Sequence, residues 1–149
     1  MNYVDNTTQE IMRICSPVAH QMRKLDRPIK FGDDFTLEAS EEYPVTALIS
    51  PFVINLDKRV WGEDADRFRP ERFDNPPENK YSFQTFSHGR RDCVGKVLAI
   101  PQLKAQFCYL VKNFKMSLKE GEESVYTRPK SSDIMIRFKK EPVLVFEKR

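Results

Sequence analysis

The sequence is poor in cysteine and histidine, and this shortage excludes two kinds of stabilised domain. Its 149 residues contain three cysteines, Cys15, Cys93 and Cys108, and two histidines, His20 and His88. An odd number of widely spaced cysteines does not make a disulfide framework. Because no C-x-x-C pair occurs and the histidines lie far apart, we do not expect a zinc site. Cys15 and Cys108 lie in apolar segments and are expected to be buried core thiols.

The sequence also lacks an excess of charge of either sign and any long apolar stretch. Lys and Arg number 25 against 22 Asp and Glu, a net charge of +3. With no basic tail, nucleic acid is not an expected partner. The longest apolar stretches fall far short of the about 20 residues that span a bilayer, and the first residues show no signal-peptide pattern. The length suits one domain, or part of one.

What the chain does contain is an unusual segment, residues 86–95, that reads Phe-Ser-His-Gly-Arg-Arg-Asp-Cys-Val-Gly. A helix is predicted to begin directly after Cys93, because apolar residues then recur at helical spacing: Val94, Val97, Leu98, Ala105, Cys108 and Val111. The amides and dipole at the start of that helix would favour the thiolate form of Cys93. Gly89 and Gly95 suit a tight turn and a close approach of the backbone to a flat ligand.

Five residues of this segment, Phe86, Gly89, Arg91, Cys93 and Gly95, fill every fixed position of the pattern F-x-x-G-x-R-x-C-x-G. In this the chain resembles the cytochrome P450 family, whose cysteine loop carries that pattern. The resemblance implies haem (iron protoporphyrin IX) as cofactor and Cys93 as the axial ligand of its iron. A thiolate ligand pushes electron density onto iron and favours O–O cleavage. It also implies that Arg91 meets a haem propionate and that Phe86 shields the sulfur from water.

Residues 2–15 are predicted to form a helix that ends at Ser16-Pro17, and two interpretations of its polar residues stay open. Thr7 and Glu10 have the spacing of a capping box, which would start the helix late. Alternatively, the resemblance makes Glu10 and Arg13 the E-x-x-R pair of the family's K helix. The two patterns have the same spacing, so the sequence alone does not separate them.

Two further landmarks follow the K-helix pattern. Arg23 stands ten residues after Arg13, where the resemblance implies a second arginine for a haem propionate. Residues 18–21, just before Arg23, would line part of the substrate pocket, and His20 there is either a hydrogen-bonded structural histidine or a substrate contact.

Residues 68–73 read Phe-Arg-Pro-Glu-Arg-Phe and match the family's "FRPERF" block. The resemblance implies that Arg72 joins Glu10 and Arg13 in a buried charge cluster. Such a cluster is costly unless it is complete. Its role would be structural, since it fixes the meander that presents the cysteine loop.

The remaining elements are predicted from alternation and turn residues. Strands are expected at 29–31, 35–37 and 45–49, and residues 75–79 are expected to form a loop. Near the end, the alternation of Ile134, Ile136 and Phe138 predicts a half-buried strand. A second strand, 143–146, follows Pro142, and the two are expected to pair as a closing hairpin. Pro101 would bend or weaken its helix, because proline cannot donate to the Val97 carbonyl.

These landmarks predict an α+β fold, with the order of the C-terminal part of the mostly helical P450 fold: K helix, short strands, meander, cysteine loop, long L helix and terminal hairpin. Residues 1–149 are expected to be the C-terminal haem-binding portion of a single domain whose upstream part is missing. The resemblance places no catalytic residue in this portion, because the helix over the distal haem face would lie upstream.

The function that the resemblance implies is that of a haem-thiolate monooxygenase. It would insert one oxygen atom from O2 into a small apolar organic substrate, with electrons from a flavin- or iron–sulfur-containing donor. Three basic residues near Cys93 are expected to help dock that donor: Arg90, Lys96 and Lys104. Full-length relatives are often anchored in the endoplasmic reticulum membrane, and no anchor is visible here, so the location of this chain stays open.

Two alternatives remain. The chain could be a truncated, catalytically silent product with little or no stable haem binding, which shares every motif with the first interpretation. It could also be a non-haem module that resembles the family by accident. The length of the natural transcript would separate the first alternative from the complete enzyme.

Overall fold

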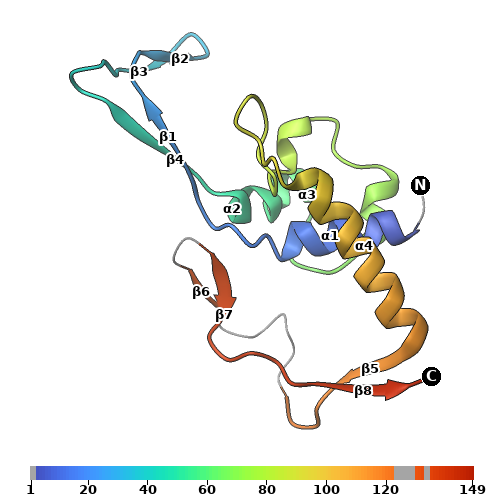
Figure 1. Ribbon diagram of the computed structural model, residues 1–149. Coiled ribbons are helices and arrows are strands. Elements are labelled where there is room, and N and C mark those ends of the chain that lie inside the picture. The colour runs from blue at the N-terminus through green and yellow to red at the C-terminus, as the bar shows by residue number, and fades with distance from the viewer. Residues whose placement is uncertain (1–2, 123–129, 133–134) are drawn as a thin grey trace.

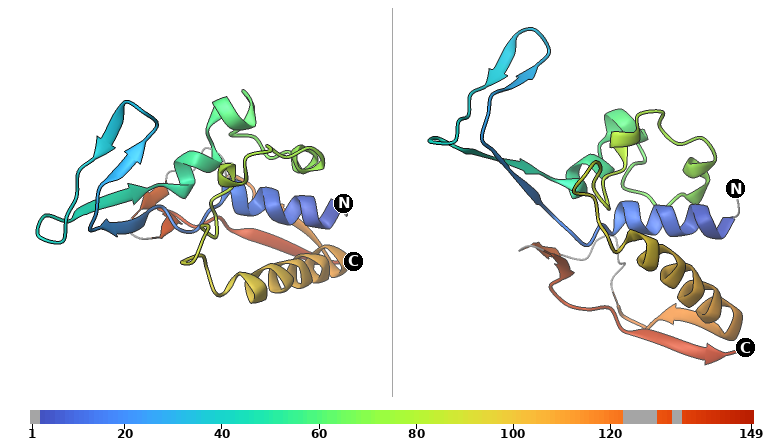
Figure 2. Two further views of the ribbon diagram at one scale, coloured as in Figure 1. Left: turned by 90° about the horizontal axis from the view of Figure 1, so that it is seen from above. Right: turned by 45° about the horizontal axis from the view of Figure 1, so that its top comes forward.

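The computed structural model describes residues 3–122, 130–132 and 135–149, and it combines helices with small antiparallel sheets. Helix α1 (Tyr3–Ile14) lies at the centre and α4 (Lys96–Asn113) lies beside it (Figure 1). Two-stranded sheets extend away from this helical part on different sides (Figure 2). The arrangement confirms the predicted α+β class.

Helix α1 buries a side that is mostly polar, which is unusual for a central helix. Asn6, Thr7, Glu10 and Arg13 are all buried there, alongside Met12 and Ile14. Because the helix already includes Tyr3, Thr7 lies in its interior and does not cap its start. The capping-box interpretation is therefore wrong.

Strand β1 (Gln21–Leu25) pairs antiparallel with β4 (Val45–Ile49), and Arg23 lies opposite Ala47. Between them stands a hairpin of β2 (Ile29–Phe31) and β3 (Phe35–Leu37), which projects from the body of the molecule (Figure 1). Gly32 at its tip has φ +61°, a conformation that glycine adopts without strain. The three strands predicted in this region are confirmed with the same bounds. Strand β1 was not predicted, because its two apolar residues are too few for a clear alternation.

Short helices form the connection from β4 to the cysteine loop. Helix α2 (Pro51–Asn55) begins after Ser50, whose hydroxyl accepts a hydrogen bond from the Val53 amide. Helix α3 (Lys58–Trp61) begins after Asp57, whose carboxylate accepts from the Arg59 amide at 3.0 Å. The Arg59 side chain also donates to this carboxylate, and these bonds lower the pKa of Asp57. Two 3-10 turns follow, η1 (Pro70–Asp74) and η2 (Lys80–Ser82).

The apolar core is small and sits under this connection. Trp61, Ala65 and Phe73 are buried together, and Phe83 packs against them. The ring centroids of Trp61 and Phe73 lie 5.6 Å apart, and those of Phe73 and Phe83 lie 5.8 Å apart. Trp61 also donates from Nε1 to the Ser82 carbonyl oxygen at 3.2 Å, which satisfies its one polar group.

Helix α4 is continuous through Pro101 and has no buried residue. The backbone of α4 therefore stays helical although Pro101 cannot donate to the Val97 carbonyl, a loss that was predicted to bend or weaken the helix. Its side facing α1 carries Leu103, Phe107 and Leu110, which line a cavity of about 180 Å³ against that helix. The expected burial of Cys108 is wrong, because Cys108 lies off this side and is exposed.

The expected burial of Cys15 is wrong as well. Cys15 occupies the turn after the last residue of α1, outside the buried side of the helix, and is exposed.

The C-terminal strands pair differently from the prediction. Strand β7 (Ile136–Phe138) pairs with β6 (Lys130–Ser132), and β8 (Leu144–Lys148) pairs with β5 (Phe114–Leu118). The Lys119 amide donates to the Val143 carbonyl oxygen at 2.9 Å and directs the last strand towards β5. The predicted closing hairpin between residues 134–138 and 143–146 is therefore wrong.

The predicted half-buried character of these strands holds in part. Ile136 and Phe138 are half-buried, all of β8 is exposed, and Ile134 lies outside the described residues. None of the described helices combines the length and the apolar character that crossing a membrane requires.

Candidate functional site

Two charged residues on the buried side of α1 and one from η1 form what we call the ion cluster: Glu10, Arg13 and Arg72. Arg13 binds Glu10 through two bonds, Nε to Oε2 at 2.7 Å and Nη2 to Oε1 at 2.8 Å. Arg72, from η1, donates from Nε to Glu10 Oε1 at 2.9 Å. Glu10 and Arg13 are fully buried, and Arg72 is 7% exposed. The Glu10–Arg13 pair lies within α1, and the bond from Arg72 to Glu10 connects this pair to η1.

Both arginines satisfy their remaining N–H groups on backbone carbonyl oxygens. Arg13 Nη1 donates to Asn55 and to Ala65, both at 2.7 Å. Arg72 donates from Nη1 to Trp61 and from Nη2 to Asp64, both at 3.0 Å. A buried ion pair is stable only if such further hydrogen bonds offset the loss of hydration. The cluster therefore ties α1 to the ends of α2 and α3 and to the turn before η1.

Asp64 adds a second negative charge to the cluster, a contact that the sequence analysis missed. Two arginines face one buried carboxylate, and Asp64 Oδ1 lies 3.5 Å from Arg72 Nη1. Arg13 also lies over the Trp61 ring, with 5.1 Å from its central carbon to the ring centroid. Cation–π contacts of this kind are favourable when they are desolvated. The only signal for Asp64 in the sequence is its position between Trp61 and the "FRPERF" block.

The cysteine loop, residues 86–95, closes on itself through its backbone. The Cys93 amide donates to the Phe86 carbonyl oxygen at 2.9 Å, and the Asp92 amide donates to that of Gly89 at 3.1 Å. Gly89 has φ +88°, as a tight turn requires of glycine. Ser87 also has a positive φ, +62°, which is uncommon for a residue with a side chain.

The end of the loop differs from the prediction in two respects. Helix α4 begins at Lys96, so residues 93–95 form a turn before it and the helix does not follow Cys93 directly. Gly95 has helical dihedral angles, φ −76° and ψ −6°, and precedes the first helical residue. A Cβ at Gly95 would lie 3.7 Å from Cys93 Sγ, an ordinary contact distance. The turn geometry therefore does not explain a glycine at this position.

Arg23 and Arg91 come together at the loop. Arg23, half-buried on β1, donates from Nη2 to Ser87 Oγ at 3.2 Å and to the Arg91 carbonyl oxygen at 3.4 Å. Arg91 itself is exposed. In the part of the chain that the structure describes, neither side chain forms a salt bridge with a carboxylate. The loop therefore presents two positive charges that an anionic ligand could pair with.

The sulfur and its surroundings fit a flat, apolar ligand with acidic groups. Cys93 is exposed, and Phe86 is half-buried. Next to Cys93 in sequence, Val94 is 93% exposed, and Val97 is 82% exposed. This combination suits a haem: the thiol could bind the iron, the exposed apolar side chains could contact the flat ring, and the two arginines could pair with its propionates.

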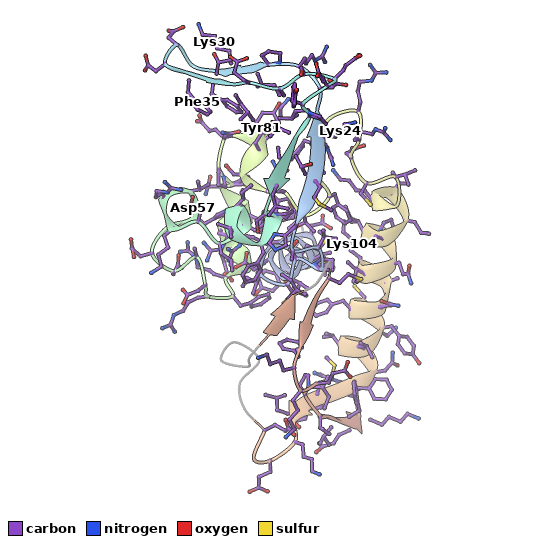
Figure 3. All side chains as sticks on the ribbon, turned by 90° about the vertical axis from the view of Figure 1, so that its left-hand side faces the viewer. Lys24, Lys30, Phe35, Asp57, Tyr81 and Lys104 are labelled. Atoms are coloured by element: carbon purple, nitrogen blue, oxygen red, sulfur yellow. The ribbon has the colours of Figure 1, made fainter. Side chains whose placement is uncertain are left out.

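The other basic residues near the loop differ in their surroundings. Lys104 extends from α4 towards α1 (Figure 3), and its Nζ lies 2.5 Å from Asp5 Oδ1. Arg90 and Lys96 are exposed. Of the three residues predicted to dock an electron donor, Lys104 is thus engaged within the chain.

The predicted pocket wall, residues 18–21, and the preceding Pro17 bind in part to the C-terminal region. The Pro17 carbonyl oxygen accepts from the Ile136 amide at 2.8 Å, and Val18 forms a β-bridge with Met135. His20 is exposed. The structure thus places β7 against this segment, a contact that no sequence pattern signalled.

Comparisons with known proteins agree with this geometry. A family model described as Cytochrome P450 matches residues 1–145. The rice protein "Cytochrome P450 714C3" is 32% identical over 78% of this chain and 23% of its own length. The human protein "Cytochrome P450 4Z1" is 32% identical over the same shares. The fruit-fly protein "Probable cytochrome P450 313a4" is 26% identical over the whole chain and 29% of its own length. The chain thus spans about a quarter of the length of these relatives.

The ion cluster generates the first prediction. Replacing Arg72 by alanine should lower the free energy of unfolding by about 3–5 kcal/mol, because it leaves Glu10 buried with one partner fewer. Urea denaturation of the complete gene product, followed by far-ultraviolet circular dichroism, measures this loss. The matched control is Arg69→Ala, which removes an exposed pair with Asp64 and should cost less than about 1 kcal/mol. Equal losses in the two variants would contradict a dominant role of the cluster.

Proposed function

The chain belongs to the cytochrome P450 family, and from that premise we propose that residues 1–149 form the haem-binding part of a haem-thiolate monooxygenase. The complete enzyme would insert one oxygen atom from O2 into a small apolar organic substrate. The observation that carries this proposal is the cysteine loop, in which Cys93 is exposed, Arg23 donates to the Arg91 carbonyl oxygen, and α4 begins at Lys96.

Cys93 is proposed as the axial ligand of the haem iron. Its amide is held by the Phe86 carbonyl oxygen, so the residue has a defined place in the loop. When bound, the haem would supply the O2 chemistry, which the thiolate ligand promotes by donating electron density. The chain's own contribution is to hold the sulfur and to orient the ring.

Arg91 and Arg23 are proposed to pair with the haem propionates. Support comes from the two hydrogen bonds that hold Arg23 against the loop, and from the exposure of Arg91. Arginine presents its donors in a planar fork that matches a carboxylate. Phe86, Gly89 and Gly95 complete the proposed cofactor-binding set, and Glu10, Arg13 and Arg72 are proposed as its structural support.

An electron donor carrying a flavin or an iron–sulfur cluster is proposed to dock near Cys93. Arg90 and Lys96 are exposed beside the loop and suit an acidic partner surface. Lys104 contributes less, because it is paired with Asp5.

We also propose that residues 1–149 are one portion of a single domain, without a catalytic residue of its own for oxygen activation. Two findings support this. The apolar residues at the start of α4 are exposed, Val94 by 93% and Leu98 by 69%. The chain also covers about a quarter of the relatives that it matches. Exposed apolar patches of this kind mark surfaces that another part of a structure covers.

The iron-ligand proposal predicts the spectrum of the reduced, CO-bound protein. The complete gene product should show the red-shifted Soret band of thiolate ligation, and Cys93→Ser should abolish it. Cys15→Ser and Cys108→Ser are the matched controls, because both thiols are exposed elsewhere, and they should leave the band unchanged. If the Cys93→Ser variant keeps the band, Cys93 is not the ligand of the iron.

The docking proposal predicts a salt-dependent change in reduction. Arg90→Glu combined with Lys96→Glu should slow reduction by the donor at low salt, because charge steering accelerates association and is screened as salt rises. Stopped-flow reduction at several ionic strengths measures it. Lys112→Glu, at the opposite end of α4, is the control and should have little effect. If the double variant behaves like the parent protein, Arg90 and Lys96 belong to ordinary surface.

A further prediction concerns residues 1–149 expressed alone, with haemin, a competent reductase and NADPH. We expect no substrate turnover above a no-protein control, because activation of O2 needs a shaped pocket that positions the cofactor and excludes water. Analysis of products by mass spectrometry tests this. Product that disappears in Cys93→Ser would overturn the proposal that the portion is incomplete.

A further inference from the structure

A second buried polar network, separate from the side chains of the ion cluster, reaches from α2 to the cysteine loop. Asn55, the last residue of α2, is fully buried, and its backbone carbonyl oxygen accepts from Arg13 Nη1 at 2.7 Å. The side chain of Asn55 binds the two residues before the cysteine loop. Oδ1 accepts from the Gln84 amide at 2.8 Å, and Nδ2 donates to Thr85 Oγ1 at 2.9 Å.

The Thr85 hydroxyl both accepts and donates a hydrogen bond. It accepts from Asn55 and donates to the Met12 carbonyl oxygen at 2.9 Å, next to Arg13 on α1. Thr85 is 6% exposed, so no bulk water replaces these bonds. Loss of either partner would leave a buried polar group unsatisfied, which is costly. Residues 84 and 85 are thereby fixed to both α1 and α2.

The fixed residues lead directly into the loop that carries the sulfur. Phe86 follows Thr85, and its carbonyl oxygen holds the Cys93 amide at 2.9 Å. The Ser87 amide donates to the Gln84 carbonyl oxygen at 3.0 Å, although Ser87 has φ +62°. A residue with a side chain keeps such a conformation only where its surroundings impose it. Residues 84–86 therefore form a fixed segment at the start of the cysteine loop.

We propose that Asn55 and Thr85 are positioning residues, which transmit the fixed geometry of the ion cluster to the backbone around Cys93. Neither side chain touches the sulfur, so both act through residues 84–86. The consequence at the iron rests on the function proposed above, whereas the consequence for the loop backbone does not.

The structure offers a conservative pair of substitutions at one position and a matched control at another. Thr85→Val keeps the shape and removes the hydroxyl, whereas Thr85→Ser keeps the hydroxyl. Asn55→Ala removes the amide. Asn6→Ala is the control, because Asn6 is also buried, 2% exposed, but its Nδ2 donates to Asp74 Oδ1 at 2.7 Å on η1.

The experiment measures hydrogen exchange in the complete gene product without haem, at a temperature where all variants are folded. In Thr85→Val and Asn55→Ala, exchange of the Cys93 amide should accelerate about tenfold relative to the amides of α4, as expected when one buried bond that restrains local opening is lost. Thr85→Ser and Asn6→Ala should leave this ratio at the parent value. With haem bound, the first two variants should also show a smaller share of the thiolate-type Soret band after CO binding.

Each outcome decides the proposal. An unchanged Cys93 ratio in Thr85→Val would overturn it, and so would an equal acceleration in Asn6→Ala, because the effect would then be general destabilisation. If the parent protein lacks the thiolate-type band, the proposed function fails, while the exchange ratios without haem still decide whether Asn55 and Thr85 position the loop.

Discussion

The bidentate pair of Glu10 and Arg13 is the interaction on which the rest of the structure depends. Both residues are fully buried, and transfer of two charges out of water is favourable only when their hydrogen bonds are complete. Here they are completed by Arg72, which donates to Glu10, and by the backbone carbonyl oxygens of Asn55 and Ala65, which accept from Arg13. Asn55 is the last residue of α2, and Trp61, whose carbonyl oxygen accepts from Arg72, is the last residue of α3. Helices of four or five residues have too few internal bonds to hold their places alone. The buried charges therefore organise the backbone around them.

The apolar core is too small to do this work alone. It consists of Trp61, Ala65 and Phe73 with Phe83 beside them, and α4 buries no residue. Hydrophobic burial is non-directional, so a core of this size would tolerate several placements of the connection from β4 to the loop. Hydrogen bonds to charged groups are directional and stronger than those between neutral groups. Orientation thus comes from Arg13 and Arg72, and the aromatic rings fill the space that these arginines define.

Sequence reasoning identified the elements whose signal is local. The strands at 29–31, 35–37 and 45–49 were predicted because turn residues separate short apolar runs, and the first two pair directly with each other. It failed where the partner is distant. Residues 143–146 look like the second half of a hairpin, yet β8 pairs with β5, about 30 residues upstream. Asp64, Asn55 and Thr85 were missed for a related reason. Each is a common polar residue whose role appears only when α1, α2 and the loop are brought together.

The cysteine loop is held by buried hydrogen bonds on one side and is exposed on the other. On its inner side, residues 84 and 85 are held by Asn55 and by the Met12 carbonyl oxygen, and Ser87 is held by Arg23. On its outer side, Cys93, Arg91 and Val94 are exposed. Ordering a ligand-binding group before the ligand arrives lowers the entropy lost on binding, so bonds made beneath the loop add to affinity for a molecule that contacts only its outer face. The same exposed apolar residues lose their contact with water when a flat apolar ligand covers them. A flat ligand bound at Cys93, as proposed above, would therefore also gain from burial of the apolar side chains of Val94 and Val97.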